Sequence, residues 1–179
     1  MRRYSFLWML FLSFSVAVAH GEEATTSVWL PVDEAASVLQ TSVETFADTP
    51  TAENLQAAKK ALSDVAAAWA AAEPHQDEAM IARRDARWVD SGEVAKADLN
   101  ELIGASRCPV PFSRDMIRKL NADMQGIGVL NYLLSETPDG ATDDAAVVAL
   151  YVAQPRRAAY LKSTASLLKE KTAALLPAP

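Results

Sequence analysis

The chain has 179 residues, half of them hydrophobic, and a formal net charge of −6 at pH 7. An acidic balance of this kind argues against binding nucleic acid or an anionic membrane through overall charge. The single cysteine, Cys108, cannot form an intramolecular disulfide. We expect Cys108 to be buried in a packed loop, with pairing to another molecule as the alternative.

The first 19 residues have the three parts of a secretory signal peptide. Arg2 and Arg3 give a positive start, an apolar run follows, and Ala17-Val18-Ala19 is a small-x-small cleavage site. The apolar run is shorter than the roughly 20 residues that a spanning helix needs, which disfavours an uncleaved membrane anchor. We therefore expect cleavage after Ala19 and a soluble, periplasmic or secreted bacterial protein with no membrane span.

Cleavage would remove two of the 17 basic residues and no acidic one, leaving 15 basic against 23 acidic residues and a net charge of −8. The remaining 160 residues are enough for one domain with its own core. We expect residues 20–30 to be a flexible mature N-terminus and residues 31–176 to form one helical domain. A composition rich in alanine and poor in glycine is typical of helices.

Two long helices are predicted in the first part of this domain. The first opens at Pro31, and its apolar residues recur every three or four positions until Asp48-Thr49-Pro50 stops it. Thr49 as N-cap and Pro50 as first helical residue then start the second helix, which Pro74 interrupts. Its inward stripe, with Trp69 as an expected core residue, is Leu55, Ala58, Leu62, Val65 and Trp69.

The middle of the chain is less regular. We expect one helix over residues 78–88, a shorter one over residues 93–103, and an extended loop containing Pro109 and Pro111. Alternating charge within the first of these helices predicts a solvated face formed by Arg83, Arg84, Asp85 and Arg87.

The last part of the chain is again strongly helical. Ser113 is predicted to cap a long helix that continues to about Ser135, and Thr137-Pro-Asp-Gly140 is a turn. Thr142 caps the final helical region, which Pro155 kinks or divides. Four long helices with short connections predict an all-α, up-and-down helical bundle with additional short helices.

The third long helix carries the most specific pattern. Asn131 falls in the middle of its inward face, and Gly128 lies on that face one turn earlier. A polar residue at the centre of a buried face needs a hydrogen-bond partner, so the simplest interpretation is a structural asparagine beside a glycine that admits a neighbouring helix. The whole stripe, with Leu120 and Met124 as core positions, is Ile117, Leu120, Met124, Ile127, Asn131 and Leu134.

Three segments, in the right order, resemble the imelysin-like family of imelysin and insulin-cleaving-peptidase-like, iron-regulated periplasmic proteins. Gly126-Ile-Gly-Val-Leu-Asn-Tyr-Leu-Leu134 is similar to the segment Gly-x-His-x-x-Glu followed by an aromatic residue and two leucines. The stretch from Thr51 through Ala68-Trp69 to Pro74 resembles the second helix of the family. Arg156-Arg157-Ala-Ala-Tyr160-Leu161 resembles its Arg-x-x-Tyr-Leu stretch, and we expect Tyr160 to lie in the core.

This resemblance implies the helical fold and the compartment, but the chain departs from the family at the metal motif. Family members place a histidine and a glutamate one turn apart as candidate metal ligands, whereas this chain has Gly128 and Asn131. Glycine offers no side chain, and an amide oxygen is a poor ligand for a transition metal. With Gly126, these residues form a degenerate motif, at which we expect no tight binding of iron or zinc and no cofactor.

The two remaining histidines give weaker candidates. His75 and Glu78 have a spacing that suits metal ligands on one helix face, but their place after Pro74 favours an ordinary solvated helix start. Cleavage would make His20 the mature N-terminus, where its amine and imidazole could chelate copper together. A mobile chain end is the simpler interpretation of His20.

No nucleophile constellation, phosphate loop or haem-attachment motif is present in the sequence. We therefore expect a non-catalytic, extracytoplasmic binding module, linked through the resemblance to iron uptake or the cell envelope. Its partner would be an envelope protein or a small ligand. The alternatives are a metallopeptidase-like or metal-binding imelysin protein, which residues 128 and 131 disfavour, and a truncated half of a longer imelysin.

Overall fold

The structure is a computed structural model that describes residues 22–105 and 112–176. The predicted signal peptide, His20 and Cys108 lie outside these ranges. Throughout the described ranges the regular structure is helical, which confirms the predicted all-α class. No helix in this part of the chain is both long enough and apolar enough to cross a membrane.

Long helices come at the two ends of the chain and short ones in its middle. The longest are α1 (Glu22–Asp48), α2 (Ala52–Ala72) and α9 (Pro155–Ala173), accompanied by the ten-residue helices α7 (Gly126–Ser135) and α8 (Asp144–Ala153). The middle contains α3 (Glu78–Arg83), α4 (Asp85–Val89), α5 (Lys96–Gly104) and α6 (Arg114–Ile117). Single 3₁₀ turns, η1 (Glu73–His75) and η2 (Ala122–Met124), join these elements.

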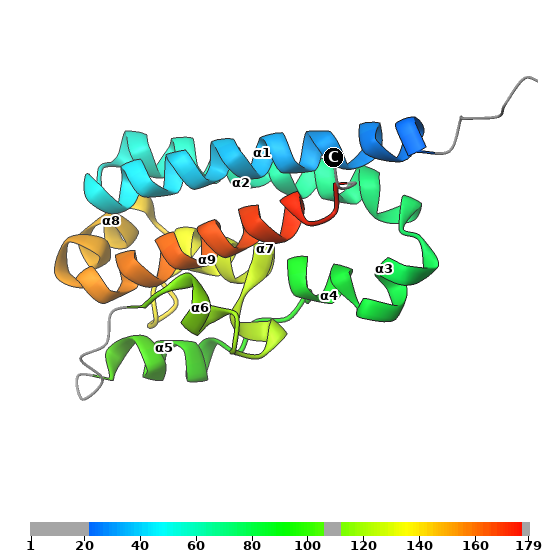
Figure 1. Ribbon diagram of the computed structural model, residues 1–179. Coiled ribbons are helices and arrows are strands. Elements are labelled where there is room, and N and C mark those ends of the chain that lie inside the picture. The colour runs from blue at the N-terminus through cyan, green and yellow to red at the C-terminus, as the bar shows by residue number, and fades with distance from the viewer. Residues whose placement is uncertain (1–21, 106–111, 177–179) are drawn as a thin grey trace, which may run out of the picture.

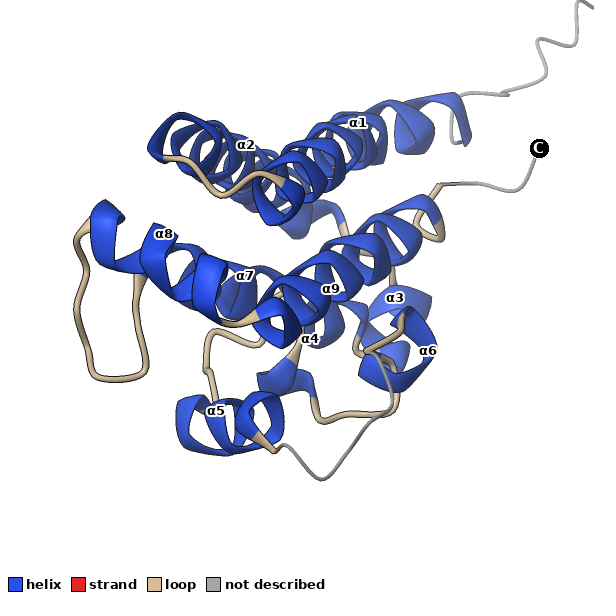
Figure 2. Ribbon diagram, turned by 90° about the vertical axis from the view of Figure 1, so that its left-hand side faces the viewer, coloured by secondary structure: helices blue, strands red, loops and turns tan. Residues whose placement is uncertain are grey.

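The helices are arranged in layers. α1 and α2 form an antiparallel pair, and α9 runs along α1 in the opposite direction (Figure 1). In the perpendicular view, α7, α8 and α9 lie below the α1–α2 pair, and the short helices α4, α5 and α6 lie on the far side of that layer (Figure 2). Lys162 and Lys169 of α9 pair with Asp48 and Asp33 of α1 at 2.9 and 2.5 Å.

The hydrophobic core lies between the α1–α2 pair and the layer of α7, α8 and α9. Trp69 is only 4% exposed, and its ring lies 5.7 Å from that of Trp29 on α1. Met124 and Tyr160 are also buried, whereas Leu120 is only partly buried at the edge of the core. The inward stripe predicted for the second helix is buried throughout: Leu55, Ala58, Leu62, Val65 and Trp69.

Two predicted helix starts are wrong in position. α1 begins at Glu22, so Pro31 lies inside the helix, and most of the stretch expected to be flexible is helical. Burial of Trp29 just before the proline and of Val32 just after it holds the helix on both sides of Pro31. The second helix is capped by Thr51 instead of Thr49, because the Thr51 hydroxyl accepts a 3.2 Å bond from the Asn54 amide.

The last region agrees with prediction more closely. Gly140, with φ +88°, closes the predicted turn by donating its amide to the Thr137 carbonyl at 3.0 Å. The cap of α8 is Asp143 and not Thr142, since the Asp143 carboxylate accepts from the Ala146 amide at 2.8 Å. Pro155 divides the region, as predicted, and is the first residue of α9.

Two predicted helices are broken in the structure. The helix expected over residues 78–88 is divided by Arg84, whose φ of +58° is in the left-handed region, and its neighbour begins at Lys96 instead of Glu93. The long helix expected from Ser113 to Ser135 is divided into α6, η2 and α7. Gly126, with φ +84°, starts α7 in a conformation that a continuous helix does not allow.

Candidate functional site

The segment that resembles the family motif starts at a crowded glycine. A Cβ atom added to Gly126 would lie 2.3 Å from the backbone oxygen of Val89, which is closer than such atoms approach. Only glycine can therefore bring the start of α7 this close to the end of α4 without a backbone shift. The hydroxyl of Tyr160 donates to the Met124 carbonyl at 2.6 Å and fixes the chain just before this contact.

Burial also keeps the Tyr160 hydroxyl protonated, so that it can donate this hydrogen bond. Its ring is fully buried and contacts Phe112 edge-on, with the ring centroids 4.9 Å apart. Because burial disfavours the charged phenolate, the pKa of the Tyr160 hydroxyl is raised above its usual value. Tyr160 therefore stays protonated and holds η2 against α9.

The prediction that Asn131 lies at the centre of the inward face is wrong. Asn131 is exposed on α7, and its side-chain oxygen accepts a long 3.5 Å bond from the Ser135 hydroxyl. The break at Gly126 explains this, because residues before and after it do not share one helical register. The stripe through Leu120 and Met124 therefore does not continue to Asn131.

Gly128 faces a different neighbour from Asn131. A Cβ atom on Gly128 would lie 3.4 Å from Val94 Cγ2 and 3.6 Å from Asp90 Oδ1, in ordinary contact with the loop that follows α4. Asp90 already accepts a bond from the Gly92 amide at 3.0 Å. At the two motif positions the chain thus presents no side chain and one exposed amide, so these residues do not fit a metal ion.

The second candidate pair is not brought together on one helix. His75 ends the 3₁₀ turn η1, Gln76 is extended, and Glu78 opens α3, so the two candidates belong to separate elements. Both side chains are exposed. Across the described residues no group of three or more histidine, cysteine, aspartate or glutamate side chains is placed to hold a metal ion.

Arg157, in the stretch that resembles Arg-x-x-Tyr-Leu, has a role that sequence reasoning missed. Its guanidinium is fully buried and donates to Asn100 Oδ1 at 3.2 Å and to the Glu136 carbonyl at 3.0 Å. The rings of Tyr132 and Tyr151 lie 5.4 and 5.9 Å from it. The Glu136 carbonyl follows the last turn of α7, where the helix dipole is negative. Arg157 thereby joins α5, α7 and α9, and this motif residue is structural.

Sequence reasoning also missed a contact between α9, α4 and the motif segment. The Lys171 ammonium donates to the Trp88 carbonyl at 3.0 Å and to Gln125 Oε1 at 2.6 Å, and lies 4.9 Å from the centre of the Trp88 ring. Desolvation, with a smaller contribution from the positive charge of Arg118, lowers the pKa of Lys171 to about 8. No periodicity in the sequence predicts this contact, since its residues lie far apart in the chain.

These features define an all-α helical bundle whose family motif lies at the junction of α4, η2 and α7. The family model of imelysin matches residues 32–178. The chain therefore belongs to the imelysin family, as its sequence resemblance predicted. No match was found among curated proteins or among solved structures.

Proposed function

We propose that this chain is an exported member of the imelysin family that acts by binding a partner or a small ligand, without metal-dependent peptidase chemistry. It would work in the periplasm or outside the cell, in iron uptake or at the cell envelope. The observation that carries the proposal is the pair of residues at the motif: Gly128 has no side chain, and Asn131 is exposed with only an amide.

The neighbouring structure supports a binding role over a metal site. Arg157, Tyr160 and Gly126 hold the motif segment in place through buried contacts. A divalent ion at Gly128 would have the Asp90 carboxylate within reach but no imidazole. One carboxylate and one amide are too few strong ligands for a closed iron or zinc site.

Calorimetric titration of the mature protein, residues 20–179, with Zn²⁺ and with Fe²⁺ under anaerobic conditions tests this proposal. We expect no stoichiometric binding at micromolar or tighter affinity. His20→Ala and His75→Ala variants serve as controls for binding at the histidines. Micromolar binding that survives both changes and disappears in Asn131→Leu would overturn the proposal and support a metal-dependent function.

Export is tested separately by N-terminal sequencing of the protein from periplasmic extracts. A mature chain that begins at His20 would support the predicted cleavage site. Recovery of the form that begins at Met1 in the membrane fraction would contradict it. Reading the DNA downstream of the gene for a continuing frame tests the alternative that the chain is half of a longer imelysin.

A further inference from the structure

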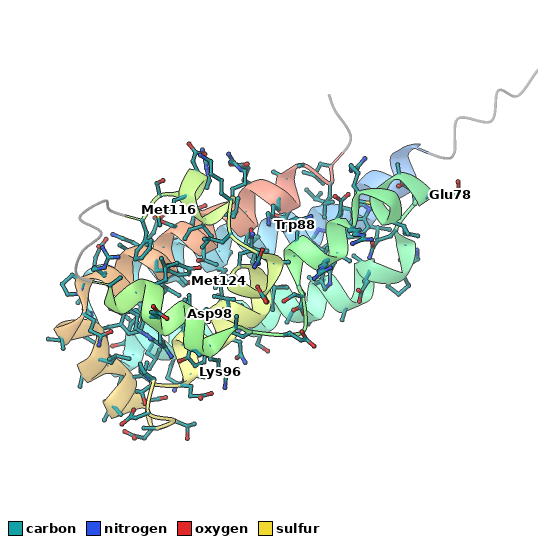
Figure 3. All side chains as sticks on the ribbon, turned by 90° about the horizontal axis from the view of Figure 1, so that it is seen from below. Glu78, Trp88, Lys96, Asp98, Met116 and Met124 are labelled. Carbon is teal, nitrogen blue, oxygen red and sulfur yellow. The ribbon has the colours of Figure 1, made fainter. Side chains whose placement is uncertain are left out.

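Two cavities share Trp88 as a lining residue. One, of about 330 Å³, lies between α4 and the end of α9 and is lined by Arg83, Lys171 and Leu175. The other, of about 370 Å³, lies toward η2 and is lined by Arg84, Arg87, Asn121 and Asp123. Trp88 lines both cavities and is 37% exposed. Figure 3 labels its side chain. We name these two cavities, together with Trp88, the Trp88 site.

The charge of the Trp88 site is opposite to that of the whole chain. Arg83 is paired with Asp85 at 2.8 Å, but no described carboxylate lies within ion-pair distance of Arg84, Arg87 or Lys171. Asp85 and Asp123 are the acidic residues among the lining side chains, so the cationic side chains outnumber the acidic ones. A chain with a net charge of −6 thus concentrates positive charge around an exposed aromatic ring.

Lys171 has donor capacity left toward its cavity. Its two acceptors, the Trp88 carbonyl and Gln125 Oε1, are both neutral, and an ammonium group has three N–H donors. Gln125 is itself fixed, because its side-chain nitrogen donates to the Leu120 carbonyl at 2.7 Å and the residue is 1% exposed. Lys171 is therefore held at the cavity wall, and its charge is not cancelled by a carboxylate.

We propose that the Trp88 site binds a small organic anion, whose carboxylate or phosphate group pairs with Arg84 and Arg87 while a planar or apolar body packs on the Trp88 ring. Guanidinium groups match the geometry of carboxylate and phosphate oxygens, and aromatic rings favour stacking with flat ligands. The cavity volumes fit a small molecule and not an extended polymer. This inference rests on the proposed binding function and gives it a ligand class.

The test uses mature protein labelled with ¹⁵N and follows the indole N–H resonance of Trp88, assigned with Trp88→Phe. The probes are naphthalene-2-carboxylate and 2-naphthyl phosphate, with neutral naphthalene-2-carboxamide as the matched control. We expect saturable shifts for at least one anion, with a Kd of roughly 1 mM or below, and at least about tenfold weaker binding of the amide. Comparing the two anions distinguishes a carboxylate ligand from a phosphate ligand.

Variants locate the binding. Arg84→Gln and Arg87→Gln should each weaken anion binding about tenfold or more, since each removes a charge-assisted hydrogen bond. Lys60→Gln removes a positive charge from α2 outside both cavities and should leave the Kd unchanged. The thermal midpoint of each variant is measured to verify folding.

The proposal would be overturned if neither anion gave saturable shifts, or if the neutral amide bound as tightly as the anions. It would also be overturned if Lys60→Gln changed the Kd as much as Arg84→Gln and Arg87→Gln do. Binding of a sulfated polysaccharide such as heparin without binding of the small anions would also overturn it. Metal binding at Asn131 in the calorimetric experiment would refute the proposed function while leaving these anion shifts in place. The two failures are therefore distinguishable.

Discussion

The long helices α1, α2 and α9 and the segment from Glu78 to Gly126 are built in different ways. In the long helices, buried residues recur every three or four positions, as in the run from Leu55 to Trp69. In the segment, the longest described helix has nine residues, and left-handed residues at Arg84 and Gly126 redirect the chain. Hydrogen bonds from single side chains, such as that of Tyr160 to Met124, then fix the loops.

The two regions therefore contribute different things to the protein. The long helices contribute mainly to stability, and the irregular segment carries residues of the proposed ligand site. The long helices present a regular apolar face, which supplies burial, and α9 adds the buried polar contacts of Arg157 and Tyr160. The irregular segment exposes the charged side chains of Arg84 and Arg87 beside Trp88, and on our proposal these side chains contact a ligand. Binding residues are commonly carried on connections that a rigid scaffold positions. Substitutions in each region test whether the two regions differ in this way.

The largest effect is expected from Trp69→Ala in the long-helix region. Trp69 is buried against Trp29, so its truncation should lower the free energy of unfolding by about 3–5 kcal/mol. Trp88→Ala is the matched control in the irregular segment and should cost about 1 kcal/mol or less, because Trp88 is more than a third exposed. Urea denaturation measures the loss of unfolding free energy in both variants. Equal losses would show that Trp69 and Trp88 contribute equally to stability.

The second largest effect is expected from Gly126→Ala. The added Cβ atom would meet the Val89 oxygen at 2.3 Å and would also require a left-handed conformation. Gly140→Ala is the control, since Gly140 has a similar φ of +88° but nothing within 4 Å of its Cβ position. Overpacking should make Gly126→Ala about 1–3 kcal/mol more destabilising than Gly140→Ala in urea denaturation. Similar costs would mean that α4 moves away from Gly126 freely.

The sequence predicted the long-helix region better than the irregular one for a physical reason. Periodicity reports which face of a helix is buried, and the stripe ending at Trp69 was found correctly because nothing interrupts it. Pro155 was found because proline favours a helix start, although the same signal at Pro31 gave a wrong start. The break at Gly126 depends instead on how closely the Val89 backbone approaches, which is a tertiary contact with no local pattern. Asn131 was misplaced because that break shifts the register.

The candidate site was predicted only in part. The motif segment and its departure at Gly128 are visible in the sequence, and the family model matches residues 32–178 around them. The Trp88 site was not predicted, because it joins α4, η2 and α9 across more than 80 residues of chain, as in the Lys171 to Trp88 hydrogen bond. The run containing Arg83, Arg84 and Arg87 was interpreted as a solvated face, and these side chains are indeed exposed.

A smaller effect, of opposite sign, is expected from Arg84→Gly. Arg84 has a φ of +58°, a conformation that glycine adopts without a steric penalty. The change should stabilise the fold by about 0.5–1 kcal/mol while weakening anion binding at the Trp88 site. Arg87→Gly, inside α4, is the control and should destabilise by about 1 kcal/mol. Loss of stability in Arg84→Gly, measured by urea denaturation, would show that the arginine side chain supports the fold there.

A pH-dependent effect is expected at Lys171, which links the two regions. Burial between α9 and the Trp88 backbone lowers its pKa from the usual 10.5 to about 8, with Arg118 adding to the shift and Glu170 opposing it. The Arg83–Asp85 pair lines the same cavity.

Between pH 8 and 10.5 the unfolded chain therefore binds more protons at Lys171 than the folded chain does. Under that condition the free energy of unfolding rises with pH, so this group makes the fold relatively more stable as pH increases through this window. The difference in stability between the wild-type protein and Lys171→Arg, which keeps its charge throughout, should increase from pH 8 to pH 10 in urea denaturation. Taking this difference cancels the titration of the other lysines and the tyrosines. A flat or falling difference would mean that Lys171 is solvated in the folded protein, and the contact joining α9 to the irregular segment would then be absent in solution.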